Sequence, residues 1–365
     1  MTGIVDADTH IIEPGDIWTE IPEAMHARRP IAVSVPTDTL YKESNAFWLI
    51  DGNIIPKPGG RGGIFLHTPS LAVREQKRDD IPLGCRELTD PLARVAEMDK
   101  LGIDIQVVYP TLFIIYLTDD PQLEVVLCRA YNHWMAEACA ITGGRIRWIA
   151  VLPLRSVEAS IQEVEFAREH GAVGALFRGI EKDLSLASPY FYPVYSELEQ
   201  ADLPVCVHTG AGCPVWTGIT DVALSATFPH VRSLPIFGFR DIVANKIPER
   251  FPTLRFGFIE AGASWVPYLL HQLHRFSRTP KEEWGPDLFR EYRLFIACEA
   301  DEDLPYLVSR IGEDNIVIGS DYGHQDPSEE RQMEQAVRGR GDLPTVVADK
   351  ILCENARRLY ALPFE

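Results

Sequence analysis

The 365-residue sequence is 46% hydrophobic and 24% charged, which is typical of a globular protein and suits one large α/β barrel or two medium domains. Its formal net charge of -18 argues against nucleic acid and anionic membranes as partners, because binding phosphates needs a basic face. The seven cysteines are scattered without CxxC spacing, which argues against a disulfide framework or a thiolate zinc site. With neither a signal peptide nor a membrane-spanning run recognisable, we expect a cytoplasmic protein.

The first predicted strand is a short apolar run that ends in acidic residues and a histidine, IVDADTH at 4–10. Alternate side chains of a strand share a face, so Asp6, Asp8 and His10 are expected to point the same way. A carboxylate and an imidazole two residues apart suit a divalent metal ion. The same pattern also fits an ordinary buried strand whose polar end reaches solvent, so this stretch alone leaves both interpretations open.

Residues 15–90 form a long region rich in proline and glycine, which we interpret as an insertion, or lid, that makes one wall of a site. Beyond it the sequence alternates between helical and strand patterns. Asp90 as N-cap and Pro91 predict a helix that ends before Gly102. Further helices are expected at 121–142, 156–170, 191–202, within 221–250, around 270–274 and at 303–311. Apolar strands are expected at 103–110, 145–153, 172–178, 203–208, 254–260, 292–298 and 315–320.

The alternation predicts a parallel sheet of eight strands, and the apolar strands indicate that both faces of the sheet are buried. We therefore expect a single α/β domain over residues 1–365, a (β/α)₈ TIM barrel with an insertion after the first strand and extra helices at the C-terminus. An open dinucleotide-binding sheet is disfavoured, because no GxGxxG follows the first strand. In such barrels the catalytic groups lie at the carboxyl ends of the strands.

Ionisable side chains follow four of the predicted strands. These are Asp8 and His10 on the first strand, His208 on the fifth, Glu260 on the sixth, and Asp321 with His324 after the last. A single such residue would be ascribed to a solvated loop, but four strand ends in register favour a metal site. Carboxylates and imidazoles without thiolates suit Zn²⁺, Mn²⁺ or Fe²⁺ rather than Ca²⁺.

Several longer motifs accompany these residues. They are DADTHIIEP at 6–14, MDKLGIDIQVVYPT at 98–111, YNHWMAEAC at 131–139, RIRWIAVLPL at 145–154, YFYPVYSELEQADLPVCVHTG at 190–210 and IGSDYGHQDP at 318–327. As a set they resemble the metal-dependent amidohydrolase superfamily, in the branch of aminocarboxymuconate semialdehyde decarboxylase and the γ-resorcylate-type decarboxylases. The resemblance implies one divalent ion, with Zn²⁺ expected first and Mn²⁺ or Fe²⁺ as alternatives. Its implied ligands are Asp8, His10, His208 and Asp321.

The resemblance further implies that Asp321 takes part in proton transfer. Many relatives have a histidine after the sixth strand, whereas this sequence has Glu260. A glutamate there can transfer protons, bind the metal or orient His208. With His324, which we expect at the mouth of the site, Asp321 and Glu260 are the candidate catalytic residues.

Substrate binding would need a cation for a carboxylate and a surface for a planar group. Arg178, at the end of the fourth strand, and Arg240, in the connection between strands five and six, are candidates for the cation. For Arg240 a salt bridge to an acidic residue is an equally good explanation. Tyr109 and Trp265 lie near predicted strand ends and suit a planar substrate, although most aromatic residues of a barrel belong to its core.

We expect non-oxidative decarboxylation of a small aromatic or unsaturated carboxylic acid. The alternative is metal-dependent hydrolysis of an amide, ester or lactone with Asp321 as base. An inactive scaffold barrel is disfavoured because all four implied ligands are present, and a phosphate-binding barrel because residues 322–326 are acidic and poor in glycine. The resemblance also implies a homodimer.

Overall fold

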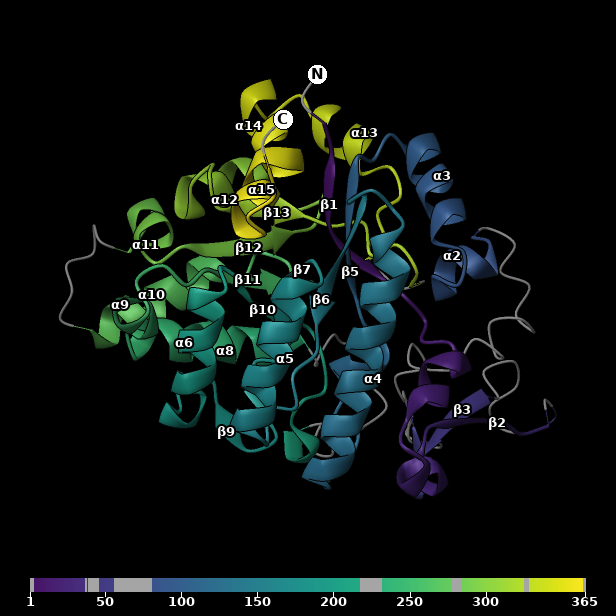
Figure 1. The fold of residues 1–365 in the computed structure, drawn as a ribbon. Coiled ribbons are helices and arrows are strands. Elements are labelled where there is room, and N and C mark those ends of the chain that lie inside the picture. The colour runs from purple at the N-terminus through teal and green to yellow at the C-terminus, as the bar shows by residue number, and fades with distance from the viewer. Residues whose placement is uncertain are drawn as a thin grey trace.

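The computed structural model describes residues 3–36, 38, 46–55, 81–216, 232–277, 284–324 and 328–363. Its centre is one eight-stranded sheet in which neighbouring strands are parallel. Helices surround this sheet on the outside (Figure 1). In spatial order the strands are β1 (Val5–His10), β5 (Ile105–Tyr109), β6 (Ile146–Ala150), β7 (Ala172–Phe177), β10 (Val205–His208), β11 (Phe256–Ile259), β12 (Leu294–Cys298) and β13 (Ile316–Ile318).

The sheet closes where β1 meets the segment that follows β13. The main-chain N–H of Asp321 donates to the carbonyl of Asp8 at 3.0 Å, and that of His10 donates to the carbonyl of Tyr322 at 2.7 Å. Gly319 permits this approach, because a Cβ there would lie 2.7 Å from the Asp8 nitrogen. The predicted (β/α)₈ barrel is therefore confirmed.

The long helices begin and end within a few residues of the predicted bounds. As expected, Asp90 caps the first of them by accepting from Ala93 N at 3.0 Å, and Gly102 ends it with a φ of 70°. The helices of this part of the chain are α2 (Leu83–Glu87), α3 (Pro91–Leu101), α4 (Pro121–Ala140), α5 (Val157–Glu169), α6 (Tyr192–Gln200), α8 (Ser233–Ala244), α9 (Ile247–Arg250), α10 (Val266–Phe276), α11 (Pro286–Glu291) and α12 (Leu304–Ile311).

Short elements in the connections were not foreseen. They are the 3₁₀ turns η4 (Leu112–Ile114) and η5 (Pro189–Phe191) and the two-residue strands β8 (Ile180–Glu181) and β9 (Leu184–Ser185). None of the described helices is both long and apolar enough to cross a membrane.

The insertion after β1 contains a small domain-like layer of its own. Two 3₁₀ helices, η1 (Gly15–Glu20) and η2 (Glu23–Arg28), precede an antiparallel sheet of β2 (Ile31–Ser34), β3 (Ala46–Ile50) and β4 (Asn53–Ile55). Trp18 is buried between Trp48 and Phe113, with its ring centroid 6.2 Å from each. This contact anchors the insertion to the loop after β5, beside α4 in Figure 1. The glycine run at 59–63 lies outside the described residues.

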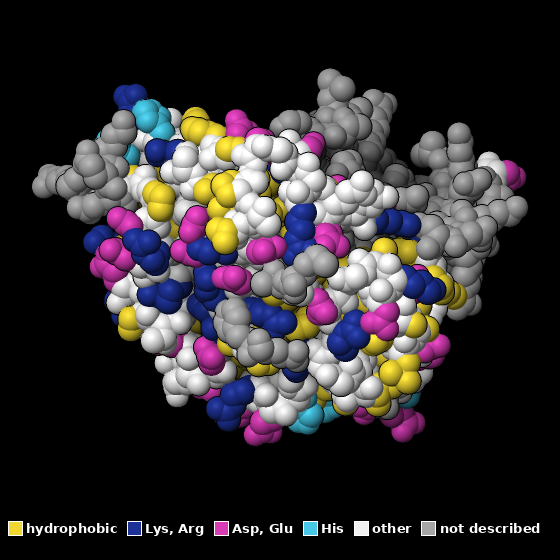
Figure 2. All heavy atoms as spheres, turned by 90° about the horizontal axis from the view of Figure 1, so that it is seen from above, with side chains coloured by type: hydrophobic (Ala, Val, Ile, Leu, Met, Phe, Trp, Pro, Cys, Tyr) yellow, Lys and Arg dark blue, Asp and Glu magenta, His cyan; other side chains and the backbone are white. Residues whose placement is uncertain are grey.

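The extra helices predicted at the C-terminus are present as α13 (Met333–Arg338), α14 (Thr345–Asp349), a π-helical turn η8 (Lys350–Glu354) and α15 (Asn355–Leu359). Directly after them, the Tyr360 hydroxyl donates to the carbonyl of Ala7 at 2.7 Å and so ties the C-terminus to β1. On the face seen in Figure 2, basic side chains are interleaved with acidic ones.

The barrel closure should be sensitive to Ser320, whose N–H and hydroxyl donate to the two oxygens of the Asp6 carboxyl group at 2.8 and 2.5 Å. Both residues are buried, and burial raises the pKa of Asp6 to about 7. Ser320→Ala should lower the free energy of unfolding by about 1–3 kcal/mol in urea denaturation, because a buried carboxyl oxygen loses its donor. Ser309→Ala on the exposed side of α12 is the control, and equal stability of the two variants would contradict this account.

Candidate metal centre

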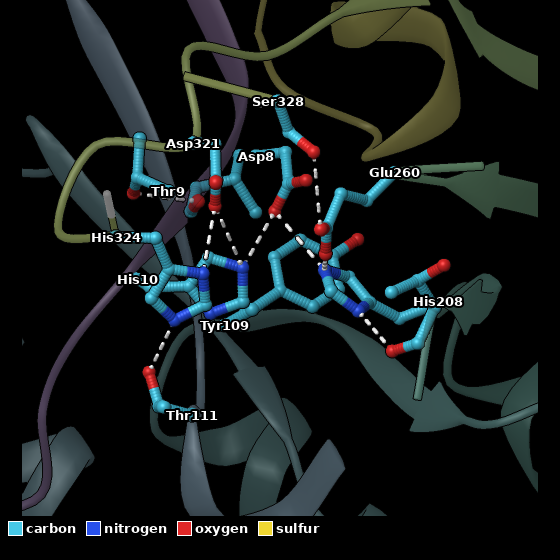
Figure 3. Close-up of polar contacts among 12 residues, drawn as sticks. Asp8, Thr9, His10, Tyr109, Thr111, His208, Glu260, Asp321, His324 and Ser328 are labelled. Carbon is cyan, nitrogen blue, oxygen red and sulfur yellow. Dashed lines mark hydrogen bonds and ion pairs between the residues drawn. The ribbon is translucent and has the colours of Figure 1, made fainter. Parts of the chain in front are cut away.

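Four side chains converge at the carboxyl ends of β1, β10 and β11 (Figure 3). Nε2 of His208 lies 3.4 Å from Oδ1 of Asp8 and 3.2 Å from Oε2 of Glu260. Nε2 of His10 lies 3.5 Å from the same Asp8 oxygen. Two donors that bind one ion at about 2.1 Å with a tetrahedral angle lie about 3.4 Å apart, so these spacings fit a single ion.

A second group shares His10 and extends the centre toward the end of β13. Oδ1 of Asp321 lies 3.5 Å from Nε2 of His10 and 2.9 Å from Nδ1 of His324. The rings of His10 and His324 are stacked, with centroids 3.8 Å apart. The structure therefore brings together all six residues that the sequence placed at the metal site or in proton transfer.

Both candidate imidazole ligands have their tautomers fixed by main-chain carbonyls. Nδ1 of His10 donates to Pro110 O at 3.0 Å, and Nδ1 of His208 donates to Thr209 O at 2.7 Å. Since a carbonyl only accepts, each ring in its neutral form has its lone pair on Nε2, which faces the centre as in histidines that bind metals. Burial and the neighbouring His324 and His208 hold the pKa of His10 well below its ordinary value, which keeps its ring neutral.

An ion at this position would give a bonding partner to buried side-chain nitrogen and oxygen atoms that otherwise face one another. Oδ1 of Asp8 and the Nε2 atoms of His10 and His208 make no hydrogen bond within the part of the chain that the structure describes. Each is buried inside the barrel mouth. Leaving such groups without a partner is costly, so the donor set fits a divalent cation.

The two carboxylates that follow β11 and β13 lie on backbone that non-glycine residues rarely adopt. Glu260 has a φ of 55° and Asp321 a φ of 54°, both in the left-handed region. Such conformations cost of order 1–3 kcal/mol and persist where the surrounding structure fixes them, often at functional sites. Here they turn both carboxylates toward the histidines.

Arg94 holds the end of β1 by hydrogen bonds, and the sequence analysis did not predict this role. This buried side chain of α3 donates to His10 O at 2.9 Å and to Thr9 Oγ1 at 2.9 Å. Its guanidinium also lies over the ring of Tyr322, 4.6 Å from the centroid. Charged residues on helices are usually exposed. Arg94 is four positions before the buried Met98 and therefore lies on the same face of α3, which is the one feature of the sequence that indicated its burial.

The two arginines expected to bind substrate are each held by an acidic residue. Arg178 follows β7, is buried, and donates from Nε to Glu181 Oε2 at 3.0 Å and from Nη1 to Ile115 O at 2.7 Å. Arg240 lies on α8 with its side chain 47% exposed, and its Nη2 is 2.6 Å from Oδ1 of Asp241. Neither belongs to the two groups that form the centre.

The two expected aromatic residues differ in position. The buried ring of Tyr109, the last residue of β5, lies 4.9 Å from the ring of His208, and its hydroxyl is 2.8 Å from that of Tyr360. Tyr109 therefore lies against the candidate ligands. Trp265 instead packs on Phe239 with centroids 5.2 Å apart and donates to Gly262 O at 2.7 Å, so its contacts lie with the core and its own loop.

Arg232 is a further cation near the centre that the sequence did not single out. Its Nη1 donates to Glu299 Oε1 at 2.5 Å, and its Nη2 donates to the Ser328 hydroxyl. That hydroxyl in turn donates to Oε1 of Glu260 at 3.4 Å (Figure 3). The connection between β10 and β11 carries several arginines, and its sequence gave no sign of which one reaches the centre.

The fold and this donor set define a metal-dependent barrel enzyme of the amidohydrolase type. The model of the amidohydrolase family matches residues 5–362, so the chain belongs to that family, as the motifs predicted.

The curated relatives are distant. The chain is 24% identical over 293 residues to γ-resorcylate decarboxylase of Rhizobium radiobacter, covering 74% of this chain and 86% of that protein. It is 24% identical over 245 residues to 2-amino-3-carboxymuconate-6-semialdehyde decarboxylase of Dictyostelium discoideum, covering 64% of this chain and 66%, just under two thirds, of that protein. A third relative, at 24% over 213 residues with 55% and 60% covered, is 2-keto-4-carboxy-3-hexenedioate hydratase of Sphingobium sp. SYK-6.

Solved structures share the fold over nearly the whole chain. An amidohydrolase of Mycobacterium avium subsp. paratuberculosis K-10 superposes with a TM-score of 0.74 at 22% identity, covering 98% of this chain and 99% of the other. A dihydroxybenzoic acid decarboxylase of Polaromonas sp. JS666, with bound manganese and the inhibitor 2-nitroresorcinol, superposes with a TM-score of 0.63 at 18% identity, covering 99% and 98%. The chain is thus an enzyme of this superfamily whose centre suits a divalent metal.

His208→Ala should weaken metal binding by at least about 10–100-fold, because the loss of even an outer-shell partner of a ligand has that effect. The measurement is titration of chelator-treated protein with Zn²⁺ or Mn²⁺. His271→Ala, on the exposed face of α10, is the matched control. Undiminished affinity in the His208 variant would remove this residue from the ligand set.

Proposed function

We propose that the protein is a metal-dependent, non-oxidative decarboxylase of a small aromatic or unsaturated carboxylic acid. The observation that carries the proposal is the buried centre itself, in which the Nε2 atoms of His10 and His208 face the carboxylates of Asp8, Glu260 and Asp321. The names of the decarboxylase relatives support this reaction class.

The proposed ligands of one divalent ion are Asp8, His10, His208 and Asp321. When bound, the ion would supply positive charge that fixes the substrate carboxylate and a neighbouring oxygen. Zn²⁺ is the first candidate from the donor set, and the manganese in the Polaromonas enzyme supports Mn²⁺ as an alternative, with Fe²⁺ as a third.

Decarboxylation breaks the bond from the substrate carbon to its carboxylate, releases CO₂ and forms a C–H bond, so the protein must deliver one proton to that carbon. We assign this proton to the pair formed by Asp321 and His324, whose Oδ1 and Nδ1 are 2.9 Å apart. Glu260 has its Oε2 3.2 Å from His208 Nε2, on the metal-facing side of that ring, and we assign it to complete the charge of the centre.

Metal-dependent hydrolysis of an amide, ester or lactone is the second candidate. The same pair of Asp321 and His324 favours it, because a carboxylate backed by an imidazole can equally accept a proton from water. Both reactions would use a small-molecule substrate. A homodimer and a cytoplasmic location stay predictions.

The first experiment is elemental analysis of protein purified without added metal, combined with a CO₂-release assay on a panel of hydroxybenzoates after loading with Zn²⁺ or Mn²⁺. We expect about one ion per chain and release of CO₂, because the centre has room for one ion between donors about 3.4 Å apart. Bound metal without CO₂, together with turnover of ester or lactone substrates, would favour hydrolysis. Absence of metal after every loading would contradict both functions.

The substrate carboxylate can be tested through the arginines. We propose that Arg232 contributes to its binding, because its contact with Ser328 leads directly to Glu260. Arg232→Gln should raise KM about 10- to 100-fold, the effect of losing a hydrogen bond to a charged group. Arg240→Gln is the comparison. An increase in KM for the Arg240 variant alone would support the substrate role predicted for that residue and contradict the role of Arg232.

A further inference from the structure

Thr111 joins the loops that follow three barrel strands. It lies just after β5 and is buried, with 1% of its surface exposed. Its N–H donates to Glu13 Oε1 at 2.9 Å and its hydroxyl donates to Ile11 O at 2.5 Å, both in the segment after β1. The same hydroxyl oxygen lies 2.8 Å from Nε2 of His324, which follows β13 (Figure 3).

The hydrogen bonds decide which atom is the donor in the contact between Thr111 and His324. A threonine hydroxyl has one proton, and here that proton goes to a carbonyl that can only accept. The oxygen therefore accepts from the imidazole, and Nε2 of His324 carries a proton. Nδ1, which is 2.9 Å from Oδ1 of Asp321, is then the nitrogen that can share a proton with that carboxylate.

We propose that Thr111 is a positioning residue that keeps a proton on Nε2 of His324, so that Nδ1 is the nitrogen turned to Asp321 and the metal centre. The hydroxyl touches neither a candidate metal ligand nor the reacting atoms. It acts through His324, by keeping a proton on Nε2 so that Nδ1 is the nitrogen that exchanges a proton with Asp321.

Packing leaves His324 little freedom to adopt another orientation. The ring is 2% exposed and stacked on His10 with an interplanar angle of 18°. The preceding Gly323 has a φ of 111°, and a Cβ there would lie 2.7 Å from His10 O. The loop therefore packs closely against β1, and the Thr111 hydroxyl is the polar contact at Nε2 that sets which ring nitrogen carries the proton.

The tautomer can be measured without any assay of activity. ¹⁵N NMR of histidine-labelled protein, in metal-free and zinc-loaded forms, distinguishes the two tautomers, and His324→Gln assigns the signal. We expect the proton on Nε2 in the wild type and in Thr111→Ser, which keeps the hydroxyl. Thr111→Val, of similar size without the hydroxyl, should lose this single state. A proton fixed on Nδ1 alone in the wild type, or an unchanged tautomer in Thr111→Val, would overturn the proposal.

The consequence for turnover rests on the proposed function. Thr111→Val should lower kcat for CO₂ release about 10- to 100-fold, as loss of an outer-shell contact does, while KM and metal content stay near those of Thr111→Ser. A full kcat in Thr111→Val would overturn the role of Thr111. If the wild type releases no CO₂, the decarboxylase function fails, and the NMR measurement still decides the tautomer.

Discussion

The hydrogen bonds that join β1 to the segment after β13 are the constraint on which the candidate centre depends. They pair the main chains of Asp8 with Asp321 and of His10 with Tyr322, residues that are more than 300 positions apart in the sequence. The carboxylates of Asp8 and Asp321 thereby each come to 3.5 Å from Nε2 of His10. Without closure of the barrel, each would lie at the edge of an open sheet.

The burial of so many ionisable groups in one place indicates what the site is built to hold. Three carboxylates and three imidazoles meet in the barrel mouth, and Asp8, His10, His208, Asp321 and His324 are almost fully buried. Buried carboxylates are unfavourable unless a cation or hydrogen-bond donors compensate them. Because a bound divalent ion would compensate several at once, its binding free energy would also stabilise the folded barrel.

Residues from neighbouring loops fix the geometry of this centre. Arg94 holds the end of β1 by its main chain, and Thr111 connects the loop after β1 to His324. Glu260 and Asp321 are kept in a left-handed backbone conformation that aims their carboxylates. The loops after β11 and β13 supply Glu260 and Asp321. The strands and the buried Arg94 supply the rigidity that proton transfer at a defined atom requires.

The strands and the ionisable residues at their ends could be predicted from the sequence. Periodicity and helix caps depend only on neighbouring residues, and barrel sites lie at the carboxyl ends of the strands. Asp8, His10, His208, Glu260 and Asp321 were found in this way. Contacts between loops could not be predicted from the sequence, because a local sequence pattern does not show which side chains of distant segments lie opposite each other. The tertiary structure alone decided that Arg178 pairs with Glu181, that Arg94 is buried beside β1, that Arg232 contacts Ser328, and that Thr111 contacts Nε2 of His324.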